Sequence, residues 1–197
     1  MNDKILFLDL DRTLFDTPRF TQALWYAIGH EFKVDAAQQL ESLPEWYHQI
    51  GDLRYYHFEE HVKHVLHKTA DEITAKIRPR LERENFLYPD TSELQNWQTR
   101  GDYQLRILSF GGEWLQKFKI SLCPRIADLP ADIILEPKNT FIAHNYSRAN
   151  GFLVDDKRNL DLPRGFTEVW LRRELLQKTK ESGLIIVNSL IEVTEAL

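Results

Sequence analysis

The sequence has a single cysteine, Cys123, and no apolar run that approaches the length of a membrane span. One thiol excludes a disulfide framework and a zinc site built from several cysteines. It is typical of proteins in a reducing compartment, so we expect a cytoplasmic location. The longest apolar runs, at residues 5–8 and 184–187, are far below the roughly 20 residues of a spanning helix, and we expect no membrane partner.

The sequence also lacks an excess of basic residues. Its 25 Lys and Arg residues are outnumbered by 30 Asp and Glu residues, which gives a net charge of -5. This balance argues against non-specific nucleic-acid binding, which needs cationic side chains to neutralise phosphates. A small anionic substrate remains compatible with it, because the local field in a cleft outweighs the net charge.

Apolar residues make up 43% of the 197 residues, enough for one well-buried domain or a domain with an insert. The aliphatic run at residues 4–10 has no polar alternation and predicts a strand buried on both faces of a parallel sheet. From residue 88 onward, short apolar runs alternate with helical patterns. Strands are expected at 103–109, 120–123, 132–135, 151–155, 168–171 and 184–187. This alternation predicts an α/β fold with a doubly wound, Rossmann-like parallel sheet.

Residues 18–84 have a different character, with helical periodicity and many charges. Asp35 is a plausible N-cap for a helix over 36–49 that ends at Gly51, and Asp71 for a helix reaching toward Arg83. This segment is too long for one crossover helix, so we expect an inserted α-helical cap at 18–84. The core would then comprise residues 1–17 and 85–197.

Polar residues end three of the predicted strands. Asp9 and Asp11 follow the first strand, Ser109 ends a second, and Asp155 and Asp156 end a third. Ligands of open α/β sheets bind beyond the carboxyl ends of the strands, so these groups should converge. Four carboxylates at one edge need a cation, and hard oxygen ligands favour Mg2+.

The spacing of Asp9 and Asp11 suggests that the two carboxylates act on one ligand in different roles. Residues two apart on an extended segment point the same way, so both carboxylates can address one ligand. One can attack as a nucleophile while the other transfers protons.

The first motif reads FLDLDRTLFDT at residues 7–17, and the acidic strand end reads GFLVDD at residues 151–156. With Ser109 between them, these segments resemble the haloacid dehalogenase superfamily of phosphotransferases, whose first signature is hhhDxDxT. The resemblance implies a motif lysine, for which Lys138 in LEPKNTFI fits best and Lys117 and Lys119 are weaker candidates. Arg12 stands where the family often has glycine, and Asn159 follows Asp156 one residue earlier than the family's usual asparagine.

The resemblance also implies roles for these residues. Asp9 would become an aspartyl-phosphate, and Asp11 would protonate the leaving oxygen and then activate water. Mg2+ would be held by Asp9, Asp11, Asp155 and Asp156. The substrate phosphate would be bound by Leu10, Asp11, Thr13, Ser109, Phe110 and Lys138, with Ser109 and Lys138 counted among the catalytic residues.

The resulting expectation is a Mg2+-dependent phosphomonoester hydrolase that acts on a small soluble phosphorylated metabolite. A phosphomutase of the same superfamily is the nearest alternative, and a catalytically idle binding or regulatory module is the alternative from another class. The sequence names neither the substrate nor the oligomeric state.

Four histidines, His57, His61, His64 and His67, recur on one side of a predicted cap helix. Imidazoles one turn apart can share a metal or an anion, but the same spacing also fits a solvated helix face. The cap aromatics Trp25, Tyr26, Trp46, Tyr47, Tyr55 and Tyr56 are expected mainly in the cap core, with one or two facing the substrate.

Overall fold

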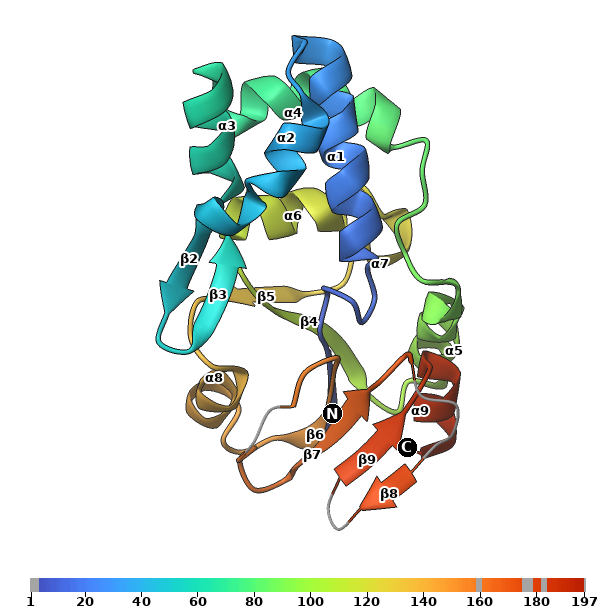
Figure 1. The fold of residues 1–197 in the computed structure, drawn as a ribbon. Helices are drawn as coiled ribbons and strands as arrows, with labels where there is room; N and C mark the ends of the chain where they lie inside the picture. The colour runs from blue at the N-terminus through green and yellow to red at the C-terminus, as the bar shows by residue number, and fades with distance from the viewer. Residues whose placement is uncertain (1–3, 159–160, 175–178, 182–183, 197) are drawn as a thin grey trace. The chain divides into compact units, whose positions relative to one another are not determined.

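The computed structural model describes residues 4–158, 161–174, 179–181 and 184–196. It divides into two compact units (Figure 1). The sheet unit comprises Met1–Phe15, Leu87–Ser109 and Leu129–Leu197, and the helical unit comprises Asp16–Phe86 and Phe110–Asp128. Each unit is described by itself below.

The sheet unit is built on a seven-stranded sheet in the order β5-β4-β1-β6-β7-β9-β8. Strands β4, β1, β6, β7 and β9 pair in parallel, and β8 is antiparallel to β9. The strand bounds are β1 Lys4–Leu8, β4 Gln104–Phe110, β5 Ala131–Ile134, β6 Asn150–Asp155, β7 Phe166–Leu171, β8 Thr179–Glu181 and β9 Leu184–Val187. The predicted Rossmann-like α/β fold is therefore confirmed.

The first strand lies at the centre of this sheet because it has no polar face to expose. Leu6, Phe7 and Leu8 are fully buried. The register aligns Leu8 with Ile107 of β4 and with Val154 of β6, so all three strands end at the same edge. Helical segments complete the unit: η2 Pro89–Ser92, α5 Glu93–Arg100, α8 Lys138–Asn145 and α9 Leu190–Ala196.

The helical unit contains α1 Thr17–Phe32, α2 Ala36–Glu41, η1 Leu43–Trp46, α3 Phe58–Leu66, α4 Ala70–Leu81, α6 Glu113–Ser121 and α7 Pro124–Ala127. The carboxylate of Asp35 caps α2, as predicted. Helix α4 begins one residue before Asp71 and is capped by Thr69, which forms a reciprocal capping box with Glu72. Asp71 was therefore the wrong choice of cap.

The helix predicted over 36–49 is wrong beyond Glu41. Pro44 follows two residues after the helix C-cap, and the chain then forms an antiparallel hairpin of β2 Tyr47–Ile50 and β3 Leu53–Tyr56. Gly51, with φ 57°, occupies the left-handed region in the two-residue turn. Gly-Asp at such a turn is a hairpin signal, and reading Gly51 only as a helix stop missed it.

The strand predicted over 120–123 is also wrong. Ile120 belongs to α6, and Cys123 is the N-cap of α7. This apolar run is buried as one face of a helical corner, which a short run of apolar residues cannot reveal by itself. The helical unit thus includes Phe110–Asp128, beyond the 18–84 insert expected from the sequence.

Within the described residues, no helix is both long enough and apolar enough to cross a membrane.

Candidate active site

The loop after β1 is a compact turn that holds the predicted first motif. The backbone N–H of Asp9 donates to Val154 at 2.9 Å and continues the sheet ladder by one residue. The chain then turns, and the carbonyl of Leu10 accepts from the N–H groups of Leu14 and Phe15. Arg12 has φ 62°, a left-handed conformation that explains why glycine suits this position.

Three buried charges meet at the end of β1. The ammonium of Lys138 donates to Asp9 Oδ1 at 2.5 Å and to Asp155 Oδ2 at 2.7 Å. All three side chains are at most 7% exposed. Lys138 is the first residue of α8, so the start of this helix sets the position of the ammonium between the two strand ends.

The electrostatics of this group favour an additional positive charge. Burial raises the pKa of Asp9 to about 8, and the ammonium of Lys138 opposes that rise only in part. Burial and the neighbouring Asp155 carboxylate raise the pKa of Asp156 to about 6. The carboxylates raise the pKa of Lys138 above its usual value against the effect of burial, so the lysine is charged.

Carboxylate oxygens of Asp9, Asp155 and Asp156 lie within 4.8 Å of one another, close enough to share one cation. Asp11 is half-buried, and its charge acts on Asp9. The donor set consists of hard oxygens, which suits Mg2+. One lysine for this many carboxylates leaves excess negative charge that such an ion would neutralise.

Two hydroxyl groups complete the edge. Thr13 Oγ1 and Ser109 Oγ are buried, and neither has a hydrogen-bond partner among the described residues. Buried polar groups are normally paired, so these two are candidates to bind a ligand. Leu10 lies in the same loop, whereas Phe110 is the last residue of β4 and the first of the second segment of the helical unit.

The other two lysine candidates belong to the helical unit and have partners within it. Lys117 is exposed and pairs with Glu113, while Lys119 is buried in the helical unit and donates to Gln116. Asn159 lies outside the described residues.

No sequence pattern indicated Arg173, which stabilises the loop after β1 through hydrogen bonds to its carbonyl groups. Its guanidinium donates to the carbonyls of Arg12 and Thr13 at 3.2 and 2.6 Å and pairs with both oxygens of Asp90. It also lies 3.8 Å from the ring centroid of Tyr88. No local motif marks Arg173, because its partners are 83 and about 160 residues away in the chain.

The four predicted histidines do not form one face. His57 precedes α3 as its N-cap, and His61 is fully buried beside Val62. His61 pairs with Tyr56 and Gln39, and the indole of Trp46 stacks on its ring. Burial lowers the pKa of His61 to about 4, so it is neutral. A solvated face is therefore wrong for His61, although His64 and His67 are exposed.

Comparison of the whole chain with solved structures shows that its fold is a known one. A protein described as a haloacid dehalogenase-like hydrolase, from Burkholderia xenovorans LB400, matches with a TM-score of 0.60 and 21% identity over 87% of this chain and 85% of that one. The HAD-hydrolase YfnB of Bacillus subtilis, bound to magnesium, matches with a TM-score of 0.58 and 14% identity over 98% of each chain. The chain has the haloacid dehalogenase fold.

A third structure of this fold, a predicted phosphoglycolate phosphatase of Haemophilus somnus 129PT, matches with a TM-score of 0.52 and 14% identity over 100% of this chain and 98% of that one. No protein-family model matches the sequence, and no curated protein matches it. At these identities the likeness shows the fold, and the chemistry of this haloacid dehalogenase-fold chain must be argued from its own side chains.

Proposed function

We propose that this protein is a Mg2+-dependent phosphomonoester hydrolase that acts on a small soluble phosphate ester. The observation that supports this most is the buried group of Asp9, Lys138 and Asp155, with a third carboxylate and two unpaired hydroxyls at the same sheet edge. This set combines a carboxylate nucleophile, positive charge and donors for phosphoryl oxygens. Phosphoryl transfer needs little more than such positioning and charge stabilisation.

In the first half of the reaction, a carboxylate oxygen of Asp9 attacks phosphorus and the bond to the ester oxygen breaks. The departing oxygen takes a proton from Asp11, two residues away in the same loop. In the second half, Asp11 takes a proton from water and the resulting hydroxide attacks phosphorus. The bond to Asp9 then breaks, which regenerates the carboxylate and releases inorganic phosphate.

Other residues of the edge stabilise the transferred group. Lys138 neutralises charge on Asp9 and on the phosphoryl oxygens, while the hydroxyls of Ser109 and Thr13 donate to those oxygens. Asp9, the Asp11 carbonyl, Asp155 and Asp156 would hold Mg2+, which would supply charge stabilisation at the phosphoryl group. Arg173 positions the loop through the carbonyls of Arg12 and Thr13.

Asp11 distinguishes this proposal from dehalogenation, an activity named for another structure of this fold. A proton-transferring acid beside the nucleophile serves an oxygen leaving group, whereas a departing halide needs no proton. A phosphomutase would use the same residues. An idle binding module is disfavoured because every position of the set holds a chemically competent side chain.

Asp9→Asn provides the direct test of the nucleophile. An amide cannot form the acyl-phosphate, so we expect turnover of an aryl phosphate to fall by at least about 10⁴-fold with the fold intact. Chelation with EDTA should abolish the activity of the unaltered protein, and Mg2+ should restore it. The measurements are steady-state phosphate release and far-UV circular dichroism.

Asp128→Asn is the matched control, because Asp128 is an exposed acid in the helical unit. Its activity should equal that of the unaltered protein. Substantial turnover by Asp9→Asn, or activity that survives exhaustive chelation, would contradict the proposal. A panel of phosphorylated metabolites separates the alternatives: a hydrolase releases inorganic phosphate, a mutase isomerises the ester, and an idle module does neither.

A further inference from the structure

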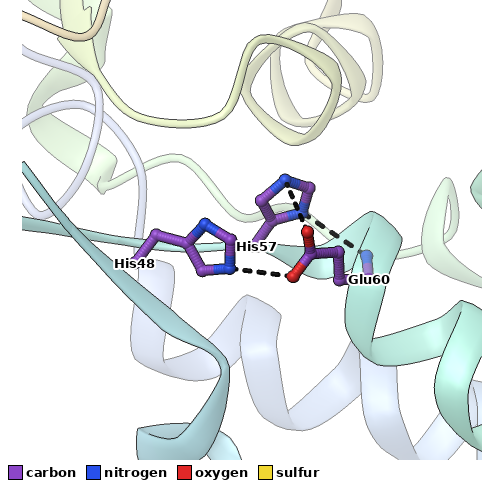
Figure 2. A group of neighbouring side chains, drawn as sticks. All are labelled: His48, His57 and Glu60. Carbon is purple, nitrogen blue, oxygen red and sulfur yellow. Dashed lines mark hydrogen bonds and ion pairs between the residues drawn. The ribbon is translucent and has the colours of Figure 1, made fainter.

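The helical unit contains a second group of side chains with metal-binding chemistry, and none of them belongs to the candidate active site. His48 lies on β2, His57 is the N-cap of α3, and Glu60 lies in the first turn of that helix. One ligand atom from each lies within 4.8 Å of the other two. Figure 2 shows both imidazole rings next to the Glu60 carboxylate, with a dashed contact from each ring to that residue.

The distances within this group resemble those of a metal centre. Nε2 of His48 lies 2.8 Å from Oε2 of Glu60, and Nε2 of His57 lies 3.8 Å from Oε1. Ligands about 2.0–2.1 Å from a tetrahedral Zn2+ are about 3.3–3.4 Å from each other. The two observed distances run to different oxygens of Glu60 and lie on either side of that value, so side-chain shifts are needed to bring one of these oxygens and both Nε2 atoms around an ion.

The protein backbone holds these ligands in a defined arrangement. His48 pairs with Tyr55 across the β2–β3 hairpin, and the Tyr55 ring lies 5.7 Å from the His48 ring and 5.9 Å from the His57 ring, measured between centroids. The two imidazoles are themselves 4.5 Å apart. The side chains of His48, His57 and Glu60 are 39%, 24% and 52% exposed, so an ion has access from solvent.

The carboxylate of Glu59 lies near the second ring nitrogen of His57, where it can act as a hydrogen-bond acceptor. Its Oε2 is buried without a hydrogen-bond partner among the described residues and lies 3.7 Å from Nδ1 of His57. Histidine ligands commonly donate their second N–H to a carboxylate, which fixes the tautomer. A proton on Nδ1 directed at Glu59 leaves the lone pair of Nε2 available for a metal.

A competing contact exists at the same nitrogen. Nδ1 of His57 also accepts from the N–H of Glu60, at a long 3.4 Å, and so caps α3. Nδ1 cannot donate to Glu59 and accept from this N–H at once. The capping tautomer carries its proton on Nε2, whereas the metal-binding tautomer carries it on Nδ1 and satisfies the buried Glu59 oxygen.

We propose that the helical unit binds a divalent transition metal, with Zn2+ as the first choice, through Nε2 of His48, Nε2 of His57 and a carboxylate oxygen of Glu60. Two imidazoles and one carboxylate are ligands that zinc prefers, and with three protein ligands the fourth position is open to water. This site uses different residues and a different metal chemistry from the proposed Mg2+ site. It does not depend on the phosphatase proposal.

The test measures Zn2+ binding by untagged, full-length protein in millimolar Mg2+, which competes with Zn2+ for the carboxylates of the sheet edge. Calorimetry gives stoichiometry and affinity, and two-dimensional NMR of the imidazole nitrogens identifies the ligands among the seven histidines. We expect one Zn2+ per chain, with perturbed ring signals from His48 and His57. Co2+ as a substitute should give the intense visible absorption of a low-coordinate, nitrogen-ligated centre.

Variants assign the site. His48→Gln, His57→Gln and Glu60→Gln should each weaken Zn2+ binding by about 100-fold or more, and Glu59→Gln by about tenfold, as expected for an outer partner. His64→Gln, on the same helix, and His144→Gln, in the sheet unit, should bind as the unaltered protein does. All variants are first checked for native circular dichroism.

Three results would overturn the proposal: no stoichiometric Zn2+ binding, binding that is unaffected by His48→Gln and Glu60→Gln, or an equal loss in His64→Gln. Because His48, Glu60 and His64 are at least partly exposed, their replacement should leave the fold intact, and the test does not depend on His57→Gln alone. Failure here would leave phosphate release in Mg2+ unchanged, so the two proposals fail separately.

Discussion

The hydroxyl groups of Ser109 and Thr13 are buried at the carboxyl edge of the sheet without hydrogen-bond partners among the described residues. A buried polar group that lacks a partner destabilises the native state by about 1–3 kcal/mol. Such a cost is tolerated where the group serves a ligand, and strained or unsatisfied groups concentrate at functional sites. At the residue scale, these two positions are where stability and the proposed chemistry conflict.

Ser109→Ala should therefore separate stability from activity. The variant lacks the buried hydroxyl that has no hydrogen-bond partner among the described residues and so avoids the cost of burying it. We therefore expect the free energy of unfolding to stay equal or rise by about 0.5–1 kcal/mol. The same change removes a donor to the phosphoryl group, and kcat should fall by about 100-fold. Urea unfolding and steady-state kinetics measure the two effects.

Ser121→Ala is the control for that variant. The hydroxyl of Ser121 donates to Phe118 and accepts from Arg78, so its loss should lower stability without changing kcat. If Ser109→Ala were destabilised and fully active, Ser109 would be an ordinary structural hydroxyl.

At the scale of elements, the corner between α6 and α7 shows how burial changes the chemistry of a side chain. Cys123 is the N-cap of α7 and is 4% exposed. Its backbone N–H donates to Ile120, and its carbonyl accepts from Ile126. Burial raises the pKa of the Cys123 thiol to about 12, so the reactive thiolate is scarce at neutral pH.

Alkylation of Cys123 by iodoacetamide at pH 8 should consequently be at least about 10³-fold slower in the native protein than in urea. The raised pKa also makes stability depend on pH. The native thiol keeps its proton while the unfolded thiol ionises above about pH 9, so the contribution of this group to the free energy of unfolding falls as the pH rises from 9 toward 12.

Cys123 is the only cysteine, so labelling followed by mass spectrometry is unambiguous. The urea-unfolded protein is the internal control. Equal labelling rates in the native and unfolded protein would show that the corner opens readily and that burial does not protect the thiol.

At the scale of the whole molecule, the chain passes from the sheet unit into the helical unit at two points. One segment follows Phe15, after the loop of the proposed nucleophile, and the other follows Ser109 at the end of β4. Within the helical unit, the Tyr55 ring packs against Phe110, with centroids 6.2 Å apart. The residue next to Ser109 in the chain is thus in contact with an aromatic of the hairpin.

We expect the helical unit to determine which ester is accepted, while the sheet unit supplies the reaction. Tyr55→Ala should lower kcat/KM for the best metabolite of the panel at least about tenfold more than for a small aryl phosphate, because remote binding energy contributes to orientation. Tyr26→Ala, at an exposed position of α1, should change neither. Equal losses on both esters for Tyr55→Ala would refute this role.

Much of the sheet unit could be predicted from the order of residues alone. A run such as residues 4–8 has no polar face, so it is stable only with both faces covered, and strands of this kind predicted the parallel sheet. Local patterns failed at two places. The 120–123 run packs as a helical corner, which buries these apolar residues as a strand would. Residues 47–49, included in the predicted helix, belong to a hairpin whose turn is at Gly51 and whose residues are mostly exposed or half-buried, so apolar periodicity does not reveal it.

The sequence by itself determined that Asp9, Asp11, Ser109, Asp155 and Asp156 stand at strand ends, because parallel strands all present their carboxyl ends to one edge. Only the tertiary structure decided which lysine meets them. The position of α8 brings Lys138 to Asp9 and Asp155, whereas Lys117 and Lys119 pair with Glu113 and Gln116 in the helical unit. The same holds for Arg173 and Asp90 and for the grouping of His48 with His57. These contacts depend on chain reversals and helix placement, and their partners have no fixed spacing that a sequence pattern could register.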